Sequence, residues 1–175
     1  PTPLKDCYVI HNDLRKDDRG HFMEAYNRTQ FKEFGLDFSV EQINVSQSKK
    51  NVFRGLHFQL SPFAQTKMVM ALSGAVIDLV IDLRKTSENY LQYFKIKLDS
   101  PDKALFVPKG FAHGYYTLKD NTCIQYAVDK PYHPASERSL SIYDPVLKIK
   151  EDFTGALISS KDLASESFNI IEHEL

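Results

Sequence analysis

The chain has 175 residues and a formal net charge of −1; 42% of its residues are hydrophobic and 26% are charged. This length suits one domain with one core, and we expect residues 1–175 to form a single domain. Because the charges are balanced and scattered, the composition argues against nucleic acid or an acidic membrane surface as a partner.

Two features of the sequence bear on where the protein acts. No apolar run approaches the roughly 20 residues that a membrane-spanning helix needs, and the first residues lack the charged-then-apolar plan of a signal peptide. The cysteines, Cys7 and Cys123, are far apart and form neither a metal-binding spacing nor a disulfide framework. Two free thiols are typical of a reducing compartment, so we expect a cytoplasmic protein.

Strand signals dominate the chain, as segments rich in Val, Ile, Phe and Tyr that are separated by turn residues. The predicted strands are Tyr8–His11, His21–Tyr26, Val40–Ser46, Val52–Gln59, Gln65–Ala71, Ala75–Leu83, Tyr93–Leu98, Ala104–Val107, Phe111–Thr117 and Thr122–Val128. A short helix is expected over Arg28–Phe34, capped by Asn27 and ended by Gly35, and short helical turns are expected after Pro145. This pattern predicts a mainly β fold, an antiparallel sandwich or barrel.

The segment Ala75–Leu83 is apolar on both faces, which predicts a strand in the middle of a sheet. Asp78 alternates with Val76 and Val80 and therefore shares their face. A carboxylate between two valines is costly unless it is paired or hydrogen-bonded. Asp78 therefore belongs either to a buried polar site or to a structural contact with backbone or water, and the second interpretation is favoured for Asp82.

His57 and His113 each lie inside a strong strand signal. A single histidine in such a strand is more often a buried structural residue than a catalyst, so its neighbours decide its interpretation. Strict alternation puts Gly55 and His57 on one face and Arg54 on the other. Arg54 and His57 reach one pocket only if the strand has a bulge near Gly55.

Two further strand residues complete a possible acid–base site. Lys67 is either a solvated edge residue or, if its strand pairs with that of His57 in a hairpin, a positive charge inside the pocket. Tyr126 is either a core tyrosine with a hydrogen-bonded hydroxyl or a proton donor. A base, a cation and a phenol are the groups needed to remove a proton next to a carbonyl, stabilise the enolate and return a proton from the other side.

A metal site is the alternative use of these histidines. Small β-barrels often hold a metal with a His-X-His pair, a carboxylate and a third histidine, but position 59 is glutamine, so the pair is absent. His57 and His113 alone are too few for a firm site. The residues therefore argue against a metal site.

An ordered set of motifs runs from about Asp18 to about Asp162. The set comprises Asp18-Arg19-Gly20 with Glu24, Gln42-Ile43-Asn44, Arg54-Gly55-Leu56-His57-Phe58-Gln59, Ala64-Gln65-Thr66-Lys67, Gly74 through Arg84, Pro108-Lys109-Gly110-Phe111-Ala112-His113-Gly114, Tyr126, Tyr132-His133-Pro134 and Ser160-Lys161-Asp162. Each motif alone is weak, but the ordered set is highly specific. In this set the chain resembles the dTDP-4-dehydrorhamnose 3,5-epimerase family.

The resemblance implies a cupin-like jelly-roll barrel or sandwich without a metal or redox cofactor. It implies epimerisation at C3 and/or C5 of a nucleotide-diphosphate 4-keto sugar, in the biosynthesis of deoxysugar or polysaccharide precursors. It also implies a homodimer in which each site borrows residues from the other subunit.

The resemblance further implies a role for each matching residue. His57 is expected as the base with Asp162 as its dyad partner, and Asp162 is singled out by the resemblance alone. Lys67 is expected to face the enolate, and Tyr126 to act as the opposing acid. Asp78 and His113 are expected to support the site, and Tyr132 to lie near the sugar or base. The residues expected to contact the nucleotide or its phosphates are Arg19, Glu24, Gln42, Asn44, Arg54 and Lys161. Of these, Arg19 and Glu24 are expected to come from the partner chain.

Three alternatives stay open at this point. In the first, the enzyme inverts only one centre, C3 or C5, or acts on another nucleotide sugar such as a GDP-4-keto-heptose. The catalytic residues do not separate these outcomes, because the outcome depends on pocket shape. A non-catalytic sugar-binding barrel is a different class, against which the complete set of His57, Lys67, Tyr126 and Asp162 argues. A metal-dependent cupin is the third.

Overall fold

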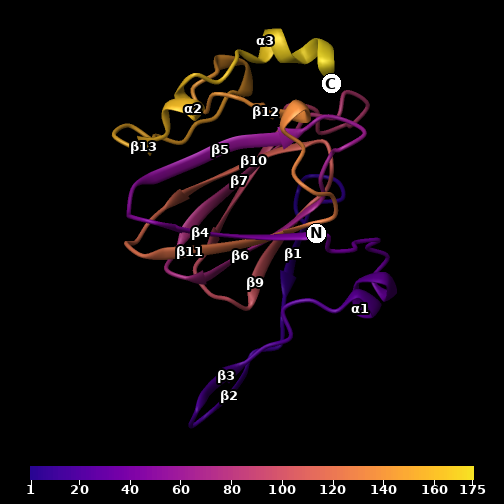
Figure 1. Ribbon diagram of the computed structural model, residues 1–175, viewed down its shortest axis with the longest axis vertical. Helices are drawn as coiled ribbons and strands as arrows, with labels where there is room; N and C mark the ends of the chain where they lie inside the picture. Colours follow the sequence, from indigo (N-terminus) through magenta and orange to yellow (C-terminus); the bar gives the residue numbers. More distant parts are fainter.

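The computed structural model describes residues 1–175 and is built around two facing β-sheets (Figure 1). The first sheet has five strands, in the spatial order β1 (Tyr8–His11), β9 (Lys103–Val107), β6 (Lys67–Ser73), β11 (Thr122–Val128) and β4 (Gln42–Ser48). The second has six, with β12 (Glu137–Ser139), β5 (Val52–Gln59), β10 (Phe111–Thr117), β7 (Val76–Asp82) and β8 (Tyr93–Leu98) in this order and β13 (Leu157–Ile158) parallel to β5.

The remaining elements lie outside the two sheets. A hairpin of β2 (Arg15–Asp17) and β3 (Gly20–Phe22) projects away from them, as Figure 1 shows in indigo. The helices are α1 (Arg28–Glu33), α2 (Ser160–Leu163) and α3 (Phe168–Ile171), and 3-10 turns occur at Pro134–Ser136, Pro145–Leu147 and Glu172–Glu174. None of the helices combines the length and the apolar character needed to cross a bilayer.

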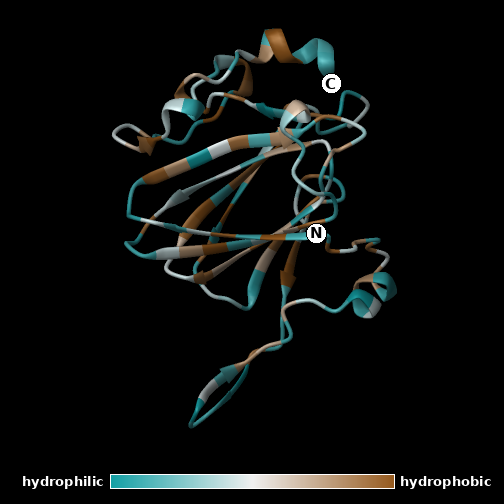
Figure 2. Ribbon diagram, in the orientation of Figure 1, coloured by the Kyte–Doolittle hydropathy of each residue, from teal (hydrophilic) through white to brown (hydrophobic).

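Strand alternation explains how the apolar residues are divided among three layers. On β7, Val76 and Val80 face the space between the sheets, whereas Leu79 and Ile81 face outward and pack under the C-terminal segment. A third cluster on the outer face of the five-stranded sheet joins Met68 of β6 to α1. Figure 2 shows the apolar residues in brown along the strands, while the β2–β3 hairpin is mostly teal and white.

Most of the predicted elements are confirmed. The bounds of β5, β8, β10 and β11 match the predicted strands, β7 lies inside its sheet, and Asn27 caps α1 by accepting from the N–H groups of Thr29 and Gln30. The predicted strand His21–Tyr26 is largely wrong, because β3 ends at Phe22 and pairs with β2, which was not predicted. All residues of this hairpin are exposed, so no burial pattern marks it in the sequence.

Candidate active site

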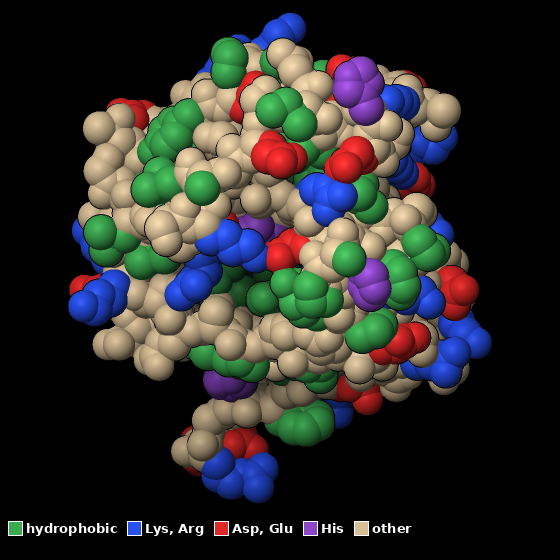
Figure 3. Space-filling model, turned by 45° about the horizontal axis from the view of Figure 1, so that its top comes forward, with side chains coloured by type: hydrophobic (Ala, Val, Ile, Leu, Met, Phe, Trp, Pro, Cys, Tyr) green, Lys and Arg blue, Asp and Glu red, His purple; other side chains and the backbone are tan.

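A cavity of about 450 Å³ lies between the two sheets. Charged side chains gather around a hollow near the middle of the face drawn in Figure 3. All predicted site residues line the cavity except Asp78, Arg19 and Glu24; those that line it are Gln42, Asn44, Arg54, His57, Lys67, His113, Tyr126, Tyr132, Lys161 and Asp162.

His57 and Asp162 form a hydrogen-bonded pair at this cavity. Nε2 of His57 donates to Oδ1 of Asp162 at 2.7 Å, and the His57 side chain is 35% exposed while that of Asp162 is 5% exposed. Burial raises the pKa of the Asp162 carboxyl, but the hydrogen bond and charge of His57 outweigh it and hold the pKa below its usual value. The carboxylate thus stays ionised beside an imidazole that solvent and a ligand can reach.

A bulge in β5 brings Arg54 and His57 to the same cavity, as the sequence analysis required. His57 pairs with His113 of β10 and Arg54 pairs with Tyr115, so the two residues between them on β5 face only Gly114. Gly55 has a φ of +123°, and a Cβ there would lie 2.6 Å from the Gly114 Cα. Only glycine fits this close approach of the two strands.

Lys67 lies on the five-stranded sheet and is almost fully buried, at 6% exposure. Neither alternative for Lys67 describes it: it is not a solvated edge residue, and its strand forms no hairpin with that of His57, because β5 and β6 belong to opposite sheets. Lys67 instead reaches across the space between the sheets, and its Nζ donates to the His57 carbonyl oxygen at 3.2 Å. Burial lowers the pKa of Lys67 to about 8, against the raising effect of the charges of Asp78 and Glu137.

Asp78 lies behind the cavity wall and supports His113. Nε2 of His113 donates to Oδ1 and Oδ2 of Asp78 at 3.0 and 3.1 Å, and Asp78 is completely buried. Of the two interpretations of Asp78, the buried polar site is the one that the geometry favours. Asp82 near the end of β7 is a structural carboxylate, as expected, although it binds Arg84 and Ser87 side chains as well as backbone.

Tyr126 faces the cavity from β11 of the five-stranded sheet, opposite His57 of β5. Burial raises the pKa of its hydroxyl, with the charge of Arg54 opposing this and that of Glu137 adding to it. The phenol therefore keeps its proton at neutral pH. Beside it, the Nε2 of Gln42 donates to Oδ1 of Asn44 at 2.8 Å.

Glu137, which was not among the predicted site residues, lines the cavity from β12. Its Oε2 accepts from the Tyr132 hydroxyl at 2.7 Å and from Nζ of Lys161 at 2.6 Å, so it joins two predicted ligand-binding residues at the rim. Burial raises the pKa of Glu137, but these two hydrogen bonds outweigh burial and lower it. The short β12 carries no strand pattern that marks this residue in the sequence.

Arg19 and Glu24 lie outside the cavity. Arg19 is at the tip of the β2–β3 hairpin, where its Nη2 pairs with Oδ2 of Asp17 at 2.6 Å. Glu24 lines a second, larger cavity of about 650 Å³ between β1, the hairpin and α1. Within one chain, then, these two residues do not join the others.

The sequence profile of the dTDP-4-dehydrorhamnose 3,5-epimerase family matches residues 1–169. The chain belongs to this family. Its members are carbohydrate epimerases, so the expectation of an isomerase is confirmed. The dTDP-4-dehydrorhamnose 3,5-epimerase of Escherichia coli (strain K12) is 37% identical over 164 residues, which are 92% of this chain and 89% of that protein.

Two solved structures show how closely the fold is shared within the epimerases. A dTDP-6-deoxy-D-glucose-3,5-epimerase from Legionella pneumophila, in complex with dTDP-4-keto-L-rhamnose, has a TM-score of 0.93 and 34% identity over 99% of this chain and 93% of that chain. A 3'-monoepimerase from Streptomyces bikiniensis, in complex with dTDP-quinovose, has a TM-score of 0.90 and 27% identity over 99% and 89%. The expected cupin-like fold is confirmed, as an open sandwich rather than a closed barrel.

Proposed function

We propose that the protein inverts C3 and C5 of a dTDP-linked 4-keto-6-deoxy sugar. The observation that carries this proposal is the His57–Asp162 pair, from β5 and α2, facing Lys67 and Tyr126 of the five-stranded sheet within one cavity. The Legionella relative, crystallised with a dTDP-4-keto sugar, supports the choice of substrate.

The first step is removal of a carbon-bound proton next to the ketone. The C–H bond breaks, the proton passes to the free ring nitrogen of His57, and the electron pair moves to the carbonyl oxygen as an enolate. Asp162 holds the imidazole through Nε2 and stabilises its charged form. The buried Lys67 ammonium, aimed at the same region, stabilises the negative oxygen more strongly than it would in water.

The second step is protonation of the same carbon from the opposite face. The Tyr126 hydroxyl gives its proton to the carbon while the enolate electrons return to form the ketone, which inverts the centre. Proton exchange with solvent resets His57 and Tyr126. The same two steps would invert the second centre once the sugar has turned so that its other carbon next to the ketone lies between His57 and Tyr126.

The test is NMR of the 4-keto sugar nucleotide in deuterated water. We expect His57→Asn to abolish deuterium incorporation at C3 and C5, while His173→Asn, a change at the C-terminal end of the chain, leaves the rate unchanged. Tyr126→Phe should allow exchange without full inversion. Wild-type exchange rates in His57→Asn would remove His57 as the base, and unchanged product formation in Tyr126→Phe would assign the acid to another group.

Inversion of C3 alone is the second candidate. The similarity to the Streptomyces bikiniensis 3'-monoepimerase favours it, because that protein shares the fold to nearly the same degree. The same NMR experiment separates the two candidates, since deuterium at C5 with changed configuration requires the double epimerase. A panel that includes other nucleotide 4-keto sugars identifies the substrate.

We further propose a homodimer of such domains, each spanning residues 1–175, with shared sites. The β2–β3 hairpin projects from the sheets and exposes 67% of Phe22, and the edge strand β4 beside the cavity exposes 57% of Ile43 and 61% of Val45. A partner's hairpin laid along this edge would cover apolar surface and bring a second Arg19 toward the cavity. Mixing inactive Arg19→Ala and His57→Asn proteins should restore activity; a mixture that stays inactive would overturn site sharing.

A further inference from the structure

Two hydroxyl groups meet inside the cavity without a role in the chemistry above. Tyr115 of β10 and Ser46 of β4 both line the cavity, and their oxygens are 2.6 Å apart, joined by a hydrogen bond that spans the two sheets. Two hydroxyls carry two hydrogens, and the bond between them uses only one. Neither hydroxyl has another protein partner, so one donor stays available to a ligand oxygen.

The depth of each residue shows which part of a sugar nucleotide this donor meets. The inner wall consists of nearly buried residues, with Lys67 and His113 at 6% and Tyr115 at 4% exposure. A cation suited to a diphosphate lies at the rim, where the Lys161 side chain is 60% exposed. A nucleotide diphosphate held at the rim therefore places its sugar against the inner wall.

The strand register puts the hydroxyl pair beside the reacting groups. Tyr115 lies two residues from His113 on the same face of β10, and Ser46 lies two residues from Asn44, the residue that pairs with Tyr126. Burial raises the pKa of the Tyr115 phenol, so it stays protonated and able to donate at neutral pH. A sugar whose reacting carbon lies between His57 and Tyr126 thus has an edge within reach of this pair.

We propose that the Tyr115–Ser46 pair is a specificity determinant that donates a hydrogen bond to an oxygen of the sugar ring or of its substituents. The proposal rests on the proposed function, because it takes the sugar of a dTDP-linked substrate as its ligand. The hydroxyl pair favours a sugar that places an oxygen next to it over a sugar that does not, because the latter leaves a buried hydrogen-bond donor unpaired.

The test compares binding of dTDP with binding of dTDP-glucose, an unreactive sugar nucleotide, by calorimetry. The double variant Tyr115→Phe with Ser46→Ala removes both hydroxyls and should weaken dTDP-glucose binding about 3- to 10-fold, the size expected for one lost hydrogen bond, and leave dTDP binding unchanged. Ser46→Thr, which keeps the hydroxyl, should bind dTDP-glucose as the wild-type protein does. The matched control is Tyr116→Phe, because Tyr116 bonds to Asn51 outside the cavity.

Three results would overturn the proposal. Unchanged dTDP-glucose binding in the double variant removes the contact, and an equal loss of dTDP binding shows that the pair does not read the sugar. A loss of the same size in Tyr116→Phe assigns the effect to general packing. In each case wild-type turnover of the 4-keto sugar stays intact, whereas its absence in the wild-type protein would overturn the proposed function and this inference together.

Discussion

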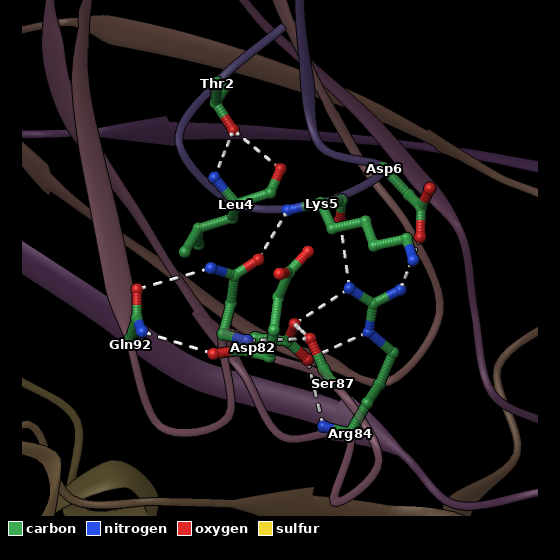
Figure 4. Close-up of polar contacts among 10 residues, drawn as sticks. Thr2, Leu4, Lys5, Asp6, Asp82, Arg84, Ser87 and Gln92 are labelled. Carbon is green, nitrogen blue, oxygen red and sulfur yellow. Dashed lines mark hydrogen bonds and ion pairs between the residues drawn. The ribbon is translucent and has the colours of Figure 1, made fainter.

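Two polar regions of this molecule use similar side chains for different ends. The candidate site holds Asp162 beside His57 and carries Lys67 as a buried cation. The other region lies where the N-terminal segment meets the end of β7, and Figure 4 shows Asp82 and Arg84 at its centre. Both regions contain a nearly buried carboxylate, yet only the first borders the cavity between the sheets.

The two regions differ in how many hydrogen-bonding positions of their side chains are already occupied by contacts within the protein. The Asp82 carboxylate accepts four hydrogen bonds, three from Arg84 and one from Ser87, at 2.6 to 3.0 Å. Arg84 also donates to Asp6 and to the Lys5 carbonyl, which fixes the N-terminal segment. His57 and Lys67 each make one such contact and keep capacity for a ligand. Saturated networks stabilise structure, whereas unsaturated ones beside a cavity are available for chemistry.

The strongest test of this comparison is Asp162→Asn. Replacing the carboxylate removes the partner that stabilises charged His57, so we expect kcat to fall about 10²- to 10⁴-fold. The amide nearly preserves shape, so the free energy of unfolding should change by about 1 kcal/mol or less. Turnover assays and denaturant titration check both. A stability loss with retained kcat would reverse the assignment of this region.

The converse change is Arg84→Met, which leaves Asp82 buried without its cation. We expect the free energy of unfolding to fall by about 2–3 kcal/mol, less than for a fully buried pair because Ser87 still donates and a quarter of the Arg84 side chain is exposed. The kcat of the folded protein should not change. Lys97→Met, which breaks the more exposed pair with Asp99, is the control and should cost about 0–1 kcal/mol.

Arg84→Met also tests how the stability of the protein depends on pH. Burial raises the pKa of Asp82, but its hydrogen bonds from Arg84 and Ser87 prevail, so the folded-state pKa lies below the unfolded one. This contribution is fully present above the unfolded pKa near 4 and is lost as pH falls through the folded value. Unfolding curves at pH 2–6 should therefore show a weaker acid dependence in Arg84→Met; an unchanged dependence would contradict the Asp82 assignment.

The pH dependence of activity distinguishes Lys67, which is buried, from Arg84, which is partly exposed. Burial lowers the pKa of Lys67 to about 8, whereas the hydrogen bond and charge of Asp82 raise that of Arg84. The Lys67 ammonium is lost as pH rises through about 8, so kcat/KM should fall about tenfold per pH unit above that value. Lys67→Arg should move this alkaline limb upward, and a wild-type profile that stays flat to pH 10 would contradict a catalytic charge on Lys67.

The sequence by itself determined the strands whose burial alternates or is continuous. The apolar run of β7 marked a strand buried on both faces, and the strand signals around His57 and Tyr126 placed both residues within strands. Asn27 and Gly35 bounded α1 because capping acts within one turn of the chain. These features depend on neighbours a few residues apart, which a sequence displays directly.

Only the tertiary structure decided which distant residues meet. Asp162 is 105 residues from His57, and Glu137 joins Tyr132 to Lys161 from a three-residue strand, so no local pattern marks either carboxylate. The placement of β5 and β6 in opposite sheets makes Lys67 reach across the cavity, an arrangement that neither sequence-based alternative for Lys67 included. Such contacts follow from how the sheets pack, because the free energy that holds them comes from burial between segments far apart in the chain.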